Sequence, residues 1–282
     1  MKYLFKLICL LFFITSYSQD QTSFDKLSHI SSRASVMQRI GITKIEINYY
    51  RPNINEREVW DDLVPYNKVW RAGANFSTTI EFSTNVIING SELSAGKYAL
   101  FILPTENEWT FIFDTQSLQF GTFFYRGQSD ALRVKVKPTI YKDYNVKSLI
   151  YFFEDINFNK GNLTLAWADR EASINISTSE EDIKKEVTDY IQKARETKNV
   201  IDYTNAVNWA LDHDMMIEEA KVWLMESKQI KEIFGNNFLL ARFAEHEGDY
   251  KKAIEIAQEV EKKFPQFKSV TDSFINRWQK KI

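Results

Sequence analysis

Cysteine is almost absent from this chain of 282 residues, and the only one, Cys9, stands in an apolar run near the N-terminus. Beyond that run the chain can form no disulfide, no thiolate metal site and no cysteine nucleophile. The three histidines, His29, His213 and His246, do not stand at the spacing of metal ligands. We therefore expect no metal site and no cofactor.

Motifs of known enzyme classes are lacking as well. The sequence has no Gly-x-Ser-x-Gly, no His-Glu-x-x-His and no glycine-rich phosphate loop. The lack of motifs does not exclude a hydrolytic triad, because its members can lie far apart in a sequence. These absences favour a protein that is not an enzyme, without deciding the question.

The chain also lacks an excess of positive charge. The 36 Lys and Arg residues are outnumbered by 38 Asp and Glu residues, which gives a formal net charge of −2. Nucleic acids and anionic membranes attract clustered positive charge, and the overall balance gives no sign of it. We therefore expect no nucleic-acid partner.

The N-terminus has the pattern of a secretory signal peptide. Lys2 and Lys6 precede the apolar residues 7–14, and small residues follow. The apolar run is shorter than the ~20 residues that span a bilayer as a helix, although a short membrane anchor stays an alternative. We predict a signal peptide over 1–18, a linker over 19–30, and an exported protein, periplasmic or secreted, without a membrane span after cleavage.

Residues 43–177 alternate between apolar and polar with period two. In the segment 43–50, for example, Ile45, Ile47 and Tyr49 share one face. We predict strands at 43–50, 78–82, 86–90, 97–103, 108–114, 132–137, 149–153, 162–167 and 172–176. Short strands with regular turn signals and no helical pattern between them favour an antiparallel β-sandwich, which we place at 31–177.

The period changes to that of a helix from residue 178 onwards. Two segments then repeat with a spacing of 33 residues, so that Ala220 corresponds to Ala253. In the second segment Gly248, Ala253 and Pro265 are spaced as in a tetratricopeptide repeat. We predict an all-α repeat tail over 178–282, and an α+β protein as a whole.

The tail is expected to end in a capping helix at 268–281. Val270, Phe274 and Trp278 stand four residues apart there and would form its inward face. Such an array needs partners for its apolar faces, and the tail would either cover part of the β domain or present a groove for a protein or peptide.

One connection between strands, residues 50–75, is long and rich in Arg, Asn, Trp and Tyr. Loops longer than ~15 residues without their own secondary structure are uncommon and are often functional. Arg71 lies there between Trp70 and the small residues 72–74, with Asn75 next. An arginine beside an aromatic residue and a close backbone is a good contact for an anion or a carbohydrate.

Each feature of this connection also has a structural interpretation. Arg71 could be buried in an ion pair with Asp61, Asp62 or Glu81, which would fix the loop on the sheet. Asp61 and Asp62 could serve with Glu58 or Glu81 as the carboxylate pair of a glycosidase, or they could lie in a solvated loop with one acid capping a turn.

The tryptophans of the region have two interpretations as well. Trp60, Trp70 and Trp109 could form a platform for stacking a sugar, but large aromatic residues more often fill a sandwich core. The candidate ligand-binding residues are Arg51, Trp60, Trp70, Arg71, Asn75 and Glu81.

Several of these segments resemble one known family. They are Arg33-Ala-Ser-Val36, Tyr50-Arg-Pro52, Val59–Tyr66, Val69–Asn75, Ala95–Pro104 and Glu108-Trp-Thr110. Together they resemble the DUF2911 family, and the Trp-Arg-x-Gly-Ala-Asn segment is the most specific part of the match. The resemblance covers about residues 31–177. It implies an exported protein, mostly found in Bacteroidetes, often with a helical-repeat tail and without an assigned function.

Two functions from different classes follow as hypotheses. The first is a non-catalytic binding or scaffolding protein of the cell envelope, whose helical repeats contact a protein partner. The alternative is a carbohydrate- or cell-wall-directed enzyme or binding module that acts through the loop between Trp60 and Glu81.

Overall fold

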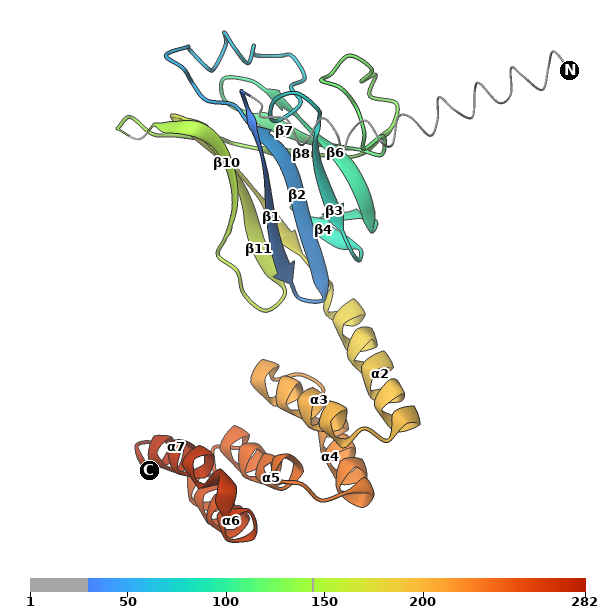
Figure 1. Cartoon of the computed structure of the whole chain (residues 1–282), viewed down its shortest axis with the longest axis vertical. Helices are drawn as coiled ribbons and strands as arrows, with labels where there is room; N and C mark the ends of the chain where they lie inside the picture. Colours follow the sequence, from blue (N-terminus) through green and yellow to red (C-terminus); the bar gives the residue numbers. More distant parts are fainter. Residues whose placement is uncertain (1–29, 144) are drawn as a thin grey trace, which may run out of the picture. The chain divides into compact units, whose positions relative to one another are not determined.

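The computed structural model describes residues 30–143 and 145–282, so the predicted signal peptide and nearly all of the predicted linker lie outside the described residues. The chain divides into two compact units, Met1–Ser179 and Glu180–Ile282. We call them the β unit and the helical unit and describe each by itself (Figure 1). No helix within the described ranges has the length and apolar character needed to cross a membrane.

The β unit contains two antiparallel sheets. The first has the order β1 (Ser32–Ile40), β2 (Thr43–Arg51), β3 (Thr78–Phe82), β6 (Gly96–Pro104), β7 (Trp109–Asp114) and β8 (Asp130–Val136). The second has the order β10 (Val146–Glu154), β11 (Lys160–Ala168), β12 (Arg170–Ser177), β4 (Val86–Ile88) and β5 (Ser91–Leu93), with β9 (Thr139–Ile140) paired to β12. Both sheets contribute to one core, as Ile47 and Leu100 of the first and Leu165 and Ile174 of the second show. The predicted α+β class and β-sandwich are confirmed.

All nine predicted strands are present, and three strands were missed. The hairpin between β4 and β5 turns at Asn89 and Gly90, which have φ values of 47° and 85°, as their sequence indicated. The strands β5 and β9 are too short to produce a pattern of their own. The strand β1 is a sheet edge, and Gln38 interrupts the alternation of Ala34, Val36 and Ile40 that would signal a strand.

The helical unit consists of six helices within the described residues. They are α2 (Glu180–Thr197), α3 (Val200–His213), α4 (Ile217–Ile230), α5 (Phe234–His246), α6 (Tyr250–Lys263) and α7 (Lys268–Gln279), with a 3-10 turn at Pro265–Phe267. The hairpins α3–α4 and α5–α6 are successive repeats, and the corresponding residues Ala220 and Ala253 are both fully buried. The helical tail with a repeated hairpin is therefore confirmed.

The two helical hairpins turn through different backbone conformations. The second hairpin turns at Gly248, with φ of 79°. In the first, Met215 stands where the glycine would be, and the turn uses two left-handed residues instead, Asp214 and Met216, with φ of 51° and 54°. A side chain in the left-handed region costs free energy that glycine avoids.

The inward face of α7 differs from the prediction. Trp278 is fully buried as expected, but its companions on that face are Thr271 and Ile275. Val270 is exposed and Phe274 only partly buried. The predicted spacing of four drifts off a straight helix face, whereas the observed steps of four and three follow it.

Candidate functional site

The long connection between β2 and β3 is anchored by tryptophans in the sandwich core. Trp60 is only 6% exposed. Its ring centroid lies 4.6 Å from that of Trp109 and 6.1 Å from those of Trp70 and Trp167. A sugar could not stack on Trp60 or Trp109 without displacing this core, so burial supports the core interpretation of these tryptophans.

The segment that follows is fixed by backbone hydrogen bonds. Trp70 and Ile102 of β6 exchange both backbone hydrogen bonds, with N–O distances of 2.8 and 2.9 Å. The carbonyl oxygen of Ala72 accepts from Thr78 Oγ1 at 2.8 Å and from Tyr151 Oη at 2.9 Å. Residues on both sides of Arg71 are therefore held, and its side chain extends from a rigid base.

Arg71 itself is half-buried and lacks the predicted ion pair. Within the described residues it makes no salt bridge to Asp61, Asp62 or Glu81, and its Nε is buried without a hydrogen-bond partner. Burial lowers the pKa of the Arg71 guanidinium from its ordinary value. Asp61 accepts instead from the backbone of Tyr66 at 3.3 Å, as a turn cap would. The guanidinium is thus a partly desolvated cation without a described carboxylate partner.

Replacing Arg71 with methionine is expected to leave the free energy of unfolding within about 0.5 kcal/mol of the wild type. The folded state lowers the pKa of Arg71, so below that pKa the charge opposes folding, and its removal orphans no described carboxylate. Urea denaturation followed by circular dichroism measures the effect. A loss of about 3–5 kcal/mol would instead reveal a buried ion pair and contradict this assignment.

The other candidates are dispersed. Arg51 donates from Nε to the carbonyl oxygen of Leu149 at 2.9 Å, which is a structural contact between the sheets. Glu81 is exposed on β3, opposite Lys97 in the strand register. Asn75 stays beside Arg71, and its carbonyl oxygen accepts from the backbone of Gly121. Of the six candidate ligand-binding residues, Arg71 and Asn75 both adjoin a further loop, at Gly121.

That further loop, residues 115–129 between β7 and β8, was missed by the sequence reasoning. Four large apolar side chains within it are between 58% and 74% exposed. They are Leu118, Phe120, Phe123 and Phe124. The signal was available in the sequence, because four such residues within seven positions follow neither a strand nor a helix period.

A cavity of about 300 Å³ opens in the β unit beside the tryptophan core. Its polar lining consists of Arg57, Glu58, Tyr66, Asn145, Asp169 and Arg170. Trp60 Nε1 and Arg170 Nε are both buried without a hydrogen-bond partner. The nearest carboxylate to the latter, Asp169 Oδ1, lies at 3.7 Å, which is too far for a hydrogen bond. Residues 168–170 were missed because they form the tight turn between two predicted strands.

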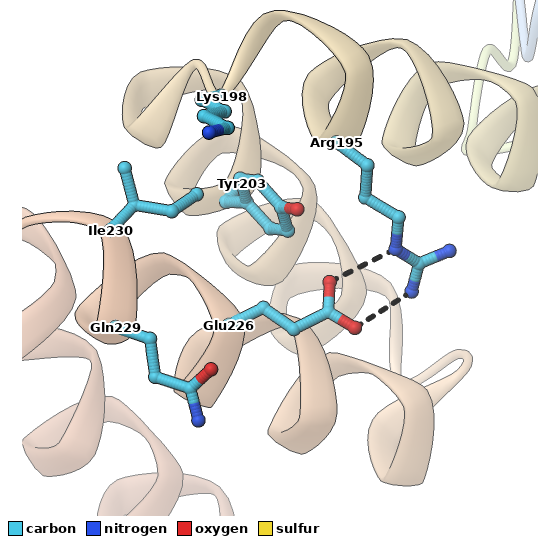
Figure 2. A pocket seen from close by; sticks show the side chains of 6 residues that line it. All are labelled: Arg195, Lys198, Tyr203, Glu226, Gln229 and Ile230. Carbon is cyan, nitrogen blue, oxygen red and sulfur yellow. Dashed lines mark hydrogen bonds and ion pairs between the residues drawn. The ribbon is translucent and has the colours of Figure 1, made fainter.

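A second cavity, of about 540 Å³, lies within the helical unit. Figure 2 shows its lining side chains, which come from α2, α3 and α4 and from the turn before α3. Arg195 donates two hydrogen bonds of 3.0 Å to Glu226, and these raise the pKa of the guanidinium. Tyr203 is buried beside them, and burial raises the pKa of its hydroxyl. This wall is thus internally satisfied.

The polar side chains on the opposite part of this lining are not bonded to other described residues. Lys198 and Gln229 are exposed, and their side chains make no ion pair or hydrogen bond with a described residue. Ile230, also exposed, adds an apolar surface beside them. Over the described ranges, no group of three His, Cys, Asp or Glu side chains comes together as a metal site would require.

Comparisons with known proteins identify a family whose function is unknown. Neither the curated proteins nor the solved structures yielded a match to this chain. A family model described as "Protein of unknown function (DUF2911)" matches residues 31–176, which is more than half of the chain and spans the twelve strands of the β unit almost completely. The chain therefore belongs to the DUF2911 family.

Proposed function

We propose that this protein is a non-catalytic binding protein whose helical unit holds a peptide segment of a protein partner. The observation that carries the proposal is the cavity of about 540 Å³ between α2, α3 and α4 (Figure 2). Helical-repeat arrays commonly bind peptides with such surfaces. The predicted signal peptide supports a location outside the cytoplasm as part of the same proposal.

The lining indicates what the segment would contain. An ammonium group at Lys198 and an amide at Gln229 are both available, and together they suit a carboxylate and the peptide backbone next to it. Ile230 offers contact to an apolar side chain. The Arg195–Glu226 pair is already satisfied, so it would shape the wall rather than bind. A segment with an acidic group beside an apolar residue fits this arrangement.

A photo-crosslinking residue at Gln229, introduced into the full chain in its native cell, is expected to capture one partner. The same substitution at Gln258, an exposed glutamine on α6 outside the cavity, is the matched control. Adding Lys198→Glu should abolish the product, whereas Lys252→Glu, an equal change of charge on α6, should not. Equal products from positions 229 and 258, or no product at either, would argue against the proposal.

The second candidate is a carbohydrate or cell-wall ligand in the cavity of the β unit. Two buried donors without acceptors, Trp60 Nε1 and Arg170 Nε, favour it, because a ligand oxygen would satisfy them. Glu58 and Asp169 at the same cavity could accept from ligand hydroxyl groups. Calorimetric titration with cell-wall oligosaccharides should give binding that Asp169→Asn weakens. Absence of any heat of binding would remove this candidate.

A further inference from the structure

The loop 115–129 exposes large apolar side chains, and polar contacts hold it against the β unit. Asp114, at its start, is fully buried and accepts from the backbone of Gln116 at 2.7 Å and from Ser129 Oγ at 2.8 Å. The backbone N–H of Gly121, in the middle of the loop, donates to the carbonyl oxygen of Asn75 at 3.2 Å. The loop is therefore tied down at both ends and at its centre, and its exposed phenylalanines are held in place.

A second set of contacts closes the loop near its end. Tyr125 donates from its hydroxyl to Asp130 Oδ2 at 2.9 Å and accepts from Arg133 Nη2 at 2.9 Å. Burial, followed by the bond to Asp130, raises the pKa of Tyr125 to about 12. The ring of Tyr125 packs 4.8 Å from that of Phe101 on the sheet. Tyr125 thus turns inward, whereas its neighbours Phe123 and Phe124 remain outside.

The loop's own charge is positive, while the acids that flank it, Asp114 and Asp130, are bonded within the β unit. Residues 115–129 contain no Asp or Glu and one arginine, Arg126. Its Nη1 donates to the carbonyl oxygens of Phe123 and Tyr125, both at 2.8 Å, and so stays among the exposed apolar residues. The guanidinium of Arg71 adjoins the same loop, since a Cβ placed on Gly121 would lie 3.4 Å from Arg71 Nη1. Neither arginine forms an ion pair with a described carboxylate.

We propose that the loop 115–129 docks the β unit on an anionic lipid surface. Leu and Phe side chains enter the boundary between headgroups and acyl chains, and nearby arginines bind lipid phosphate groups. Arg71 and Arg126 supply these cations beside Leu118, Phe120, Phe123 and Phe124. The overall charge of −2 would not attract such a surface, so the attraction is local to the loop 115–129 and Arg71.

The position of the loop and its backbone bonding suit contact with a flat surface through side chains. The loop extends past the ends of β7 and β8, on the side of the β unit where the connection between β2 and β3 also lies (Figure 1). The backbone N–H groups of Gly121 and Tyr125 are already bonded within the unit, so they cannot pair with the backbone of a partner chain. This inference is independent of the cavity in the helical unit.

The near absence of cysteine allows a site-specific test. In a Cys9→Ser background of the full chain, Phe124→Cys is labelled with an environment-sensitive fluorophore, and Met37→Cys on β1, 56% exposed at that methionine, is the labelled control. Vesicles of phosphatidylglycerol should shift the emission at position 124 to the blue and leave that at position 37 unchanged. Vesicles of phosphatidylcholine should shift position 124 much less.

A second measurement uses unlabelled variants. Phe123→Ser is expected to lower partitioning to phosphatidylglycerol vesicles about tenfold. Arg71→Gln should weaken the preference for anionic over neutral lipid, and Arg71→Gln with Arg126→Gln should remove it. Unchanged emission at position 124 with anionic vesicles would overturn the proposal. An emission shift without vesicles, rising with protein concentration together with a dimer mass in light scattering, would overturn it in favour of contact between two copies.

Discussion

Alanine in place of Trp60 is expected to lower the free energy of unfolding of the β unit by about 3–5 kcal/mol. The indole fills a site among three other tryptophans and is nearly inaccessible, so its removal leaves a cavity that the rigid sheets cannot close. Because Trp60 Nε1 has no hydrogen-bond partner, the expected loss is one of packing alone. Urea denaturation followed by far-ultraviolet circular dichroism measures it.

Phe123→Ala is the control for this prediction. It removes a large aromatic side chain that is exposed, and the expected change is within about 0.5 kcal/mol. If Trp60→Ala proved as mild as Phe123→Ala while abolishing the binding of a sugar, the indole would be a ligand platform after all. The pair thus separates the two interpretations of the tryptophans that the sequence left open.

Alanine in place of Gly73 is the second substitution with a large expected effect, a loss of about 1–3 kcal/mol. An added Cβ would lie 2.8 Å from Thr78 Oγ1 and 3.1 Å from the backbone oxygen of Tyr50. The threonine cannot turn away freely, because its hydroxyl donates to the carbonyl oxygen of Ala72 at 2.8 Å. The substitution should therefore force apart β3 and the segment that carries Arg71.

Gly235 on α5 offers a control with the opposite sign. A Cβ there would meet its nearest neighbour, Thr204 Cγ2, at 3.5 Å, which is ordinary contact. Gly235→Ala should therefore stabilise the helical unit by about 0.5–1 kcal/mol, since alanine loses less backbone entropy in a helix. A destabilising result at position 235, or a neutral one at position 73, would contradict the steric argument.

The regular elements were predictable because their pattern repeats locally. Alternation along 43–50 reports a buried face of a sheet, and the Asn89–Gly90 pair reports a turn that needs positive φ. The period of 33 between Ala220 and Ala253 reports stacked hairpins in the same way. Each of these signals lies within one segment or between two copies of one segment.

The features of the candidate sites were less predictable because they depend on contacts across the chain. Whether Arg71 meets a carboxylate is decided by the path of a loop without a period, and the predicted partners turn out to lie elsewhere. The cavity of the β unit combines Glu58 with Asp169, which only the folding of two sheets brings to one place. The phenylalanines at 120–124 break the strand and helix periods in the sequence, but only the folded chain shows how far each of them is exposed.

The edge strand β1 also bears on how this protein avoids aggregation with a second copy. Among the described strands β1 pairs only with β2, so its outer side presents unpaired backbone groups that a second copy could extend into a continuous sheet. An antiparallel pairing of two such strands centred on Val36 would place Arg33 of one copy directly opposite Arg39 of the other. Like charges facing each other across a strand pair are repulsive. The two arginines therefore oppose edge-to-edge aggregation through this register of β1.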